Sequence, residues 1–266
     1  MRASPLLLSL AAVALAGVAS AEPPPPASRW VGAPVLPAGQ VEIAVVHELL
    51  VARYLAFDDQ LGDPWADGID LAVALGPDLT VGVSHSSRAL GTVDRGGGWC
   101  HEARFHWCPS AYAGGSIDAR WRVHDGARVD LAALARVGLV GIDPLQPVVR
   151  LGASARAAAG PRGRWWLVAE PEVQIGLDHR ELGNRDVLIA PLWLGVGRTR
   201  AAGWLQTGLR GQLVGLGDKV EIPFVLGGAV RLGPVRLGAE LGWPKLAGPQ
   251  NNGGELHLAL WLAATH

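Results

Sequence analysis

Residues 255–266 read Glu-Leu-His-Leu-Ala-Leu-Trp-Leu-Ala-Ala-Thr-His, and their side chains alternate between two kinds. One phase carries leucine four times in succession, at Leu256, Leu258, Leu260 and Leu262. The other phase is mixed and holds Glu255, His257, Ala259 and Trp261. A period of two is typical of a β-strand with one apolar face and one mixed face. Because a final strand needs a neighbour on its free edge, we expect this strand to close a membrane-spanning barrel.

The same period of two recurs along the chain from Val41 onward. The alternating stretches predict an all-β fold, a single closed antiparallel up-and-down barrel of about 12 strands, within a range of about 10 to 14. Residues 130–137 and 153–159 are rich in alanine and also allow short helices, but their charged residues at alternate positions favour strands. One phase of these strands is apolar. The other phase supplies the candidate lumen-lining residues Asp118, Arg120, Arg122, Arg136, Arg150, Arg156, Glu170, Glu172, Arg210, Arg231, Arg236 and Glu240.

The predicted links between strands alternate in length. Tight turn signals occur at residues 76–78, 124–126, 160–163, 200–203 and 233–234. Longer links lie between them, at residues 58–67, 89–115, 141–147, 179–185, 216–222 and 248–254. Short turns at one rim and long loops at the other are typical of bacterial outer-membrane barrels. With an even number of strands, both ends of the barrel segment are expected at the short-turn, periplasmic rim.

Residues 1–21 resemble a secretory signal peptide. Arg2 precedes an apolar run of about 13 residues, and Ala19-Ser20-Ala21 has the small-x-small pattern of a cleavage site. The alternative, a membrane anchor, would need a run of roughly 20 residues. We therefore predict cleavage after Ala21, a Pro-rich periplasmic arm over residues 22–39 and a barrel over residues 40–266, with the protein in the outer membrane.

A soluble periplasmic β-protein would also alternate, so the period alone does not decide between the two. The signal peptide, the asymmetry of the links and the lack of charge on the apolar phase together favour lipid. The 11 tryptophans give further support. Five of them lie near predicted strand ends, where an aromatic girdle meets the membrane interface, although Trp261 shares the lumen phase: Trp121, Trp165, Trp204, Trp243 and Trp261.

The charged phase allows two interpretations. Arginines and acids pair across strands and fill a narrow barrel, or the arginines form a ladder that favours anions in an open channel. An unpaired charge inside a dry lumen would be costly, so a closed barrel requires pairing. The formal net charge of −1 and the absence of a basic cluster argue against a nucleic-acid partner.

The longest predicted loop contains both cysteines of the chain, Cys100 and Cys108. In an exported protein two cysteines favour a disulfide. The alternative is a zinc site that also uses His101 and His106, but the spacing is not a common zinc pattern. We therefore predict a disulfide, no metal site and no cofactor.

The stretch Ser84-His85-Ser86-Ser87 has residue types used by serine hydrolases. Adjacent strand residues point to opposite faces, so Ser84 and His85 cannot form a dyad with each other. No catalytic residue is predicted, and the protein is not expected to be an enzyme.

Residues 35–123 resemble the start of a group of uncharacterised bacterial outer-membrane barrel proteins with a domain of unknown function. The resemblance is carried by Leu36-Pro37-Ala38-Gly39-Gln40-Val41-Glu42, Gly68-Ile69-Asp70-Leu71 and Leu79-Thr80-Val81-Gly82-Val83-Ser84-His85-Ser86-Ser87. It implies an outer-membrane location and a barrel fold, with no substrate. Barrels of this kind tend to end in an aromatic residue, whereas this chain ends in His266.

The sequence therefore predicts an outer-membrane β-barrel of a Gram-negative-type bacterium, a narrow pore or structural barrel. The alternative is a barrel with a ligand-binding or enzymatic lumen. The expected partners are outer-membrane lipid, the barrel-assembly machinery and a small solute.

Overall fold

A computed structural model of the chain describes residues 33–53, 65–85, 98–100, 112, 114–126, 128–159, 164–182, 184–197, 200–216, 220–248 and 255–266. This part of the chain forms fourteen strands and one short 3-10 helix, η3 (Arg180–Leu182). The strands are β1 (Val41–Arg53), β2 (Trp65–Ala74), β3 (Leu79–Ser84), β4 (Trp99–Cys100), β5 (Gly115–Asp125), β6 (Val129–Ile142), β7 (Leu145–Ala159), β8 (Trp165–Ala169), β9 (Glu172–Gly176), β10 (Val187–Gly197), β11 (Ala201–Gln212), β12 (Val220–Leu232), β13 (Val235–Ala247) and β14 (Glu255–Thr265).

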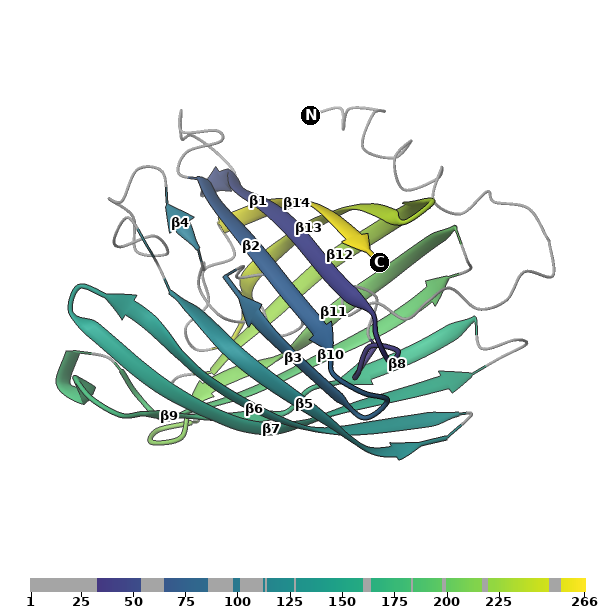
Figure 1. The fold of residues 1–266 in the computed structure, drawn as a ribbon. Coiled ribbons are helices and arrows are strands. Elements are labelled where there is room, and N and C mark those ends of the chain that lie inside the picture. The colour runs from purple at the N-terminus through teal and green to yellow at the C-terminus, as the bar shows by residue number, and fades with distance from the viewer. Residues whose placement is uncertain are drawn as a thin grey trace, which may run out of the picture.

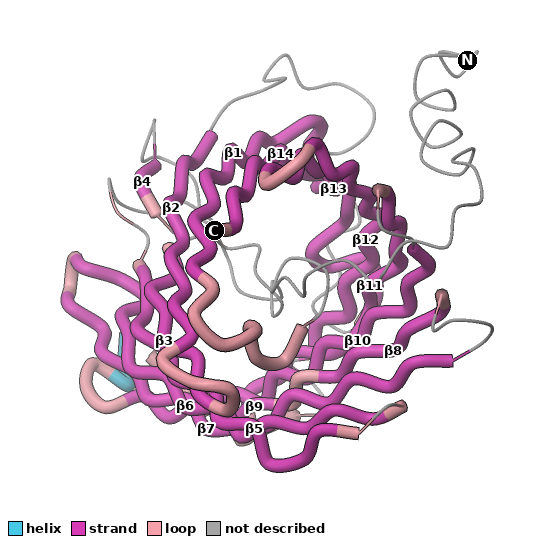
Figure 2. Tube along the Cα trace, turned by 45° about the vertical axis from the view of Figure 1, so that its right-hand side comes forward, coloured by secondary structure: helices cyan, strands magenta, loops and turns pink. Residues whose placement is uncertain are grey.

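The strands form one closed antiparallel sheet (Figures 1 and 2). Apart from β4, β8 and β9, the strands follow one another around the barrel in chain order, and β1 pairs with both β2 and β14. The two-residue strand β4 pairs only with one end of β2. Strands β8 and β9 share one position between β7 and β10. The fourteen strands therefore occupy twelve positions around the barrel, which confirms the predicted fold class and strand number.

Side chains of the two phases have opposite exposure. The apolar phase is open to the outside; Ile117, for example, is 66% exposed and Val137 is 61% exposed. The polar phase faces the interior, where Arg120 and Glu170 are 0% exposed. The alanine-rich residues 130–137 and 153–159 lie within β6 and β7, so the strand prediction was correct there.

Three predicted tight turns are found among the described residues, and one predicted long link is wrong. Tight turns join β2 to β3, β5 to β6 and β12 to β13 at one rim, where the backbones of Val41 and His266 also exchange hydrogen bonds of 3.0 and 2.9 Å. We call this end of the barrel the short-turn rim. The predicted long link at residues 141–147 is instead a two-residue turn at Asp143–Pro144. The β6–β7 hairpin therefore includes Gly141 and Pro147, the residues from which a loop was predicted.

Prolines remove backbone hydrogen-bond donors from the sheet between β8 and β9, in β10 and in β12. Pro171 separates β8 from β9 and carries no amide hydrogen to donate. On the next strand Pro191 lies opposite Gly208 of β11, whose φ of +144° is unfavourable for other residues. Pro223 coincides with a register shift between β12 and β13. The phase of β8 nevertheless continues into β9, so Glu170 and Glu172 still point inward.

Both the predicted signal peptide and most of the predicted Pro-rich arm lie outside the described residues. Within the described residues, no helix is long and apolar enough to cross a membrane.

Candidate functional site

The inward face of the barrel carries all the candidate lumen residues. Seven of them are buried: Asp118, Arg120, Arg136, Glu170, Glu172, Arg236 and Glu240. The other five are partly buried: Arg122, Arg150, Arg156, Arg210 and Arg231. All but Glu170 lie in strands that alternate between the interior and the outside, and Glu170 keeps the inward phase between β8 and β9, so the period of two brings them to one surface.

An ion-pair network occupies the wall formed by β5, β6, β7 and the β8–β9 position. Nη1 and Nη2 of Arg120 donate to Oε1 and Oε2 of Glu170, at 2.6 and 3.3 Å. The hydroxyl of Ser154 donates to the same Oε1 at 2.7 Å. Nε of Arg120 also lies 3.5 Å from Oδ2 of Asp118. The two-point contact between Arg120 and Glu170 belongs to the stronger class of charged hydrogen bonds.

The network continues toward the long-loop rim. Nη2 of Arg136 lies 3.1 Å from Oε1 of Glu172 and 3.9 Å from Oε2 of Glu170. Nε of Arg150 donates to the side-chain amide oxygen of Gln174 at 3.0 Å. Acids and arginines therefore compensate one another along this wall, as the pairing interpretation expected.

The remaining charged candidates have separate partners. Nε of Arg122 lies 3.4 Å from Oδ1 of Asp130, and Nη1 of Arg210 lies 3.7 Å from Oε2 of Glu221. Arg231 donates to the carbonyl of Gly233 in its own turn. Two candidates interact electrostatically with a charged neighbour: Arg156 with Asp130 and Arg236 with Glu42.

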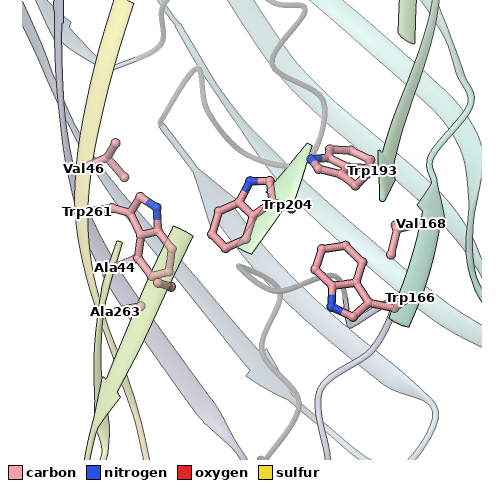
Figure 3. Packing of buried hydrophobic residues seen from close by; sticks show 9 residues of the cluster. Ala44, Val46, Trp166, Val168, Trp193, Trp204, Trp261 and Ala263 are labelled. Carbon is pink, nitrogen blue, oxygen red and sulfur yellow. The ribbon is translucent and has the colours of Figure 1, made fainter. Parts of the chain in front are cut away.

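Apolar and aromatic side chains gather in another part of the interior. A buried cluster combines four indoles with small aliphatic side chains from β1, β8, β10, β11, β12 and β14: Ala44, Val46, Trp166, Val168, Trp193, Trp204, Ala229, Trp261 and Ala263 (Figure 3). The rings of Trp204 and Trp261 stack at 6.4 Å, and Nε1 of Trp204 donates to Oε1 of Glu240 at 2.9 Å. We call these four indoles, Trp166, Trp193, Trp204 and Trp261, the indole cluster.

The girdle prediction was wrong for two tryptophans of the indole cluster, Trp204 and Trp261. Glycine on the neighbouring strand makes room for inward rings: Gly227 lies opposite Trp204, and Gly238 opposite Trp261. A Cβ atom at either glycine would overlap the facing indole. Trp166 has the same relation to Gly195. A tryptophan on the charged phase opposite an inward glycine is a sequence signal that could have identified the cluster.

Other tryptophans do face outward near strand ends. Trp121 is 63% exposed and Trp165 is 49% exposed, both near the short-turn rim. Near the other rim, Trp243 and Phe224 lie on the outward phase with their ring centroids 6.3 Å apart. These positions fit an aromatic girdle.

The end of the predicted arm lies inside the barrel. Residues 33–36, the lumen segment, are all buried, and Val35 and Leu36 are 0% exposed. Leu36 packs with Ala72 and Ala74 on the inward face of β2. Its backbone N–H donates to Oγ1 of Thr80 at 2.9 Å. Figure 2 shows this loop within the ring of strands.

No catalytic or metal constellation forms among the described residues. Ser84 points inward and donates to Oδ1 of Asp118 at 3.3 Å. His85 belongs to the other phase and stacks on Trp99 at 5.1 Å. No group of three or more His, Cys, Asp or Glu that could hold a metal ion occurs within the described ranges. The predicted disulfide and its zinc alternative lie outside them, since only the backbone of Cys100 is described.

The barrel is similar to solved outer-membrane barrels. The KdgM porin, solved in complex with disordered oligogalacturonate, gives a TM-score of 0.57 at 7% identity over 84% of this chain and 98% of that one. The NanC porin gives 0.60 at 5% identity with the same coverage. An outer membrane channel from Pseudomonas putida F1 gives 0.54 at 13% identity over 87% and 97%. No family model and no curated protein sequence matches the chain. These likenesses show that the chain has the fold of an outer-membrane β-barrel.

Proposed function

We propose that this protein resides in the outer membrane of a Gram-negative-type bacterium and acts as a narrow pore for small solutes. One observation carries the proposal: the exposure of the two phases is inverted relative to a water-soluble protein. Ile117 is 66% exposed on the outside, whereas Arg120 is fully buried inside. Large apolar patches are unfavourable in water, but a bilayer requires them, together with a sheet that closes on itself.

The ion-pair network supports a pore with weak charge selectivity. Arg120 and Arg136 face Asp118, Glu170 and Glu172 across the same wall. Rings of one charge select ions of the opposite charge, but here the two signs alternate. We therefore expect similar permeability to small cations and anions, rather than the anion preference of an arginine ladder.

The location is tested first. Membrane-extracted protein should migrate faster on gels before boiling than after it, as closed barrels do. Leu192→Arg, near the middle of β10, should destabilise the barrel in lipid by about 2–4 kcal/mol, whereas Leu232→Arg at the end of β12 should cost about 0–1 kcal/mol. A soluble protein with an unshifted gel band, or equal effects of the two substitutions, would contradict the membrane barrel.

The pore is tested in planar bilayers. The purified, folded protein should produce small discrete conductance steps, with a reversal potential near zero in a salt gradient. A strongly anion-selective reversal potential would favour the arginine ladder. Silent bilayers at all voltages, with a heat-modifiable barrel confirmed on gels, would contradict the pore.

The indole cluster favours a second candidate, a ligand-binding lumen. Aromatic faces bind apolar ligands and apolar faces of rings. Tryptophan fluorescence should then change saturably when neutral sugars or fatty acids are titrated into the folded barrel. Unchanged emission with both classes of compound would leave the pore as the better account.

A further inference from the structure

The lumen segment lies at the short-turn mouth of the barrel, which a solute that crosses the lumen would have to pass. Its contacts are with Ala72, Ala74 and Thr80, which lie at the ends of β2 and β3 nearest the short-turn rim. Each of these side chains belongs to the inward phase. The segment is therefore held against the inner wall at one mouth of the barrel.

The backbone explains how the segment enters the lumen. Gln40 N–H donates to the carbonyl of Pro37 at 3.0 Å and closes a turn immediately before β1. Gly39 has a φ of +77° in this turn, a conformation that favours glycine. The chain thus reverses at the rim, so residues 33–36 lie inside the ring while β1 forms part of its wall.

Polar contacts fix the segment at its last two residues, Val35 and Leu36. The N–H of Leu36 donates to Thr80, which is itself fully buried. Nη2 of Arg122 lies within 3.5 Å of the carbonyl of Val35, and Nη1 donates to the carbonyl of Pro77 in the β2–β3 turn at 2.9 Å. One guanidinium therefore joins the segment to the rim.

The indole cluster lies in the same half of the barrel. Trp166 is the second residue of β8 and Trp204 the fourth of β11, both counted from the short-turn rim. The ion-pair network lies on a different part of the wall, from β5 to the β8–β9 position. The lumen segment and the indole cluster therefore both occupy interior positions near one mouth, from different parts of the wall.

We propose that residues 33–36 are a built-in stopper that narrows the short-turn mouth, and that displacing them widens the pore. This proposal rests on the proposed pore function. Apart from its continuity with β1, the segment is held to the wall only by noncovalent contacts, the apolar contacts of Leu36 and two backbone hydrogen-bonding groups.

The test compares conductance in planar bilayers for four proteins. Leu36→Asp places a carboxylate among alanines and should expel the segment. Ala38→Asp is the matched control, because it adds the same charge two residues away at an exposed position. A chain that joins residue 21 directly to Pro37 removes the segment altogether. We expect several-fold larger conductance steps for Leu36→Asp and for the deletion, and unaltered steps for Ala38→Asp.

A labelling experiment provides a readout that does not depend on conduction. The thiol of Leu36→Cys should react slowly with a water-soluble maleimide, and the thiol of Ala38→Cys should react rapidly. Thr80→Val removes the acceptor for the Leu36 N–H and should accelerate labelling at position 36. Rapid labelling at position 36 in otherwise unaltered protein would overturn the stopper.

The two proposals fail in different ways. If the unaltered protein conducts and the Leu36→Asp and deletion proteins conduct equally, the stopper is overturned and the pore stands. If all four proteins fold into heat-modifiable barrels and all are silent, the pore and the stopper are both overturned.

Discussion

The pair Arg120–Glu170 allows the sharpest test of how the interior is stabilised. Both side chains are fully buried, and two hydrogen bonds of 2.6 and 3.3 Å join them. Arg120→Met removes the guanidinium but keeps an unbranched chain of similar length. Glu170→Gln keeps the shape of the side chain and removes its charge. The double variant replaces both charges at once.

The expected magnitudes follow from burial. After Arg120→Met, the carboxylate of Glu170 keeps Ser154 at 2.7 Å, but its nearest remaining cation is Arg136 at 3.9 Å. Breaking a buried pair by removing one partner costs about 3–5 kcal/mol, whereas replacing both partners is often nearly neutral. The double variant should therefore be less destabilised than the sum of the single variants, by about 2 kcal/mol or more.

Urea unfolding in lipid vesicles, followed by the gel shift of the folded barrel, measures these free energies. The exposed pair Arg180–Asp186 is the control, because its shortest contact is also 2.6 Å but its side chains are 52% and 26% exposed. Arg180→Met and Asp186→Asn should change stability little, since solvent weakens exposed pairs. The reasoning would be refuted if the substitutions at Arg120 and Glu170 were additive within about 0.5 kcal/mol.

Three further predictions concern other parts of the chain. Gly238→Ala should destabilise the barrel by about 1–3 kcal/mol in urea unfolding, because its Cβ would overlap the ring of Trp261; Gly203→Ala, whose Cβ would meet only a carbonyl oxygen at 3.7 Å, should not. Hydrogen bonds from Arg180 hold the pKa of Asp186 below its ordinary value. The stability that this loop contact contributes is therefore fully present above the ordinary aspartate pKa and is lost as the pH falls through the lowered pKa. Carboxyl NMR shifts measure this titration, and an unshifted pKa would contradict the prediction. Mass spectrometry of non-reduced peptides should find the two cysteines joined, and free thiols in freshly isolated protein would rule out the disulfide.

Much of the fold could be predicted because a barrel strand exposes one phase to lipid and the other to the lumen. The leucines of residues 255–266 and the charged phase of β5 both follow this rule. The rule failed at residues 141–147, where glycine and prolines predicted a loop. Pro147 is accommodated within β7 instead, and the turn contains only Asp143 and Pro144.

The partners inside the lumen could not be predicted, because they depend on register. Arg120 lies on β5 and Glu170, 50 residues away in sequence, lies between β8 and β9, with β6 and β7 between them in the sheet. Alternation places both side chains on the inward face, but it does not determine whether they lie at the same level along the barrel axis. For the same reason, the burial of residues 33–36 against β2 has no signal in a proline-rich sequence.

The pairing of β1 with β14 has a consequence for how the barrel forms. Among the described strand pairs, this one alone joins opposite ends of the barrel, with Glu42 opposite Thr265. Every other pair joins strands that lie closer together along the chain, whereas this contact closes a loop of nearly the whole barrel segment and so has the largest cost in conformational entropy. Nonlocal contacts of this kind slow folding. Until β14 arrives, β1 and β13 each keep an unsatisfied edge, so a chain arrested at that stage is the species most prone to pair with a second copy.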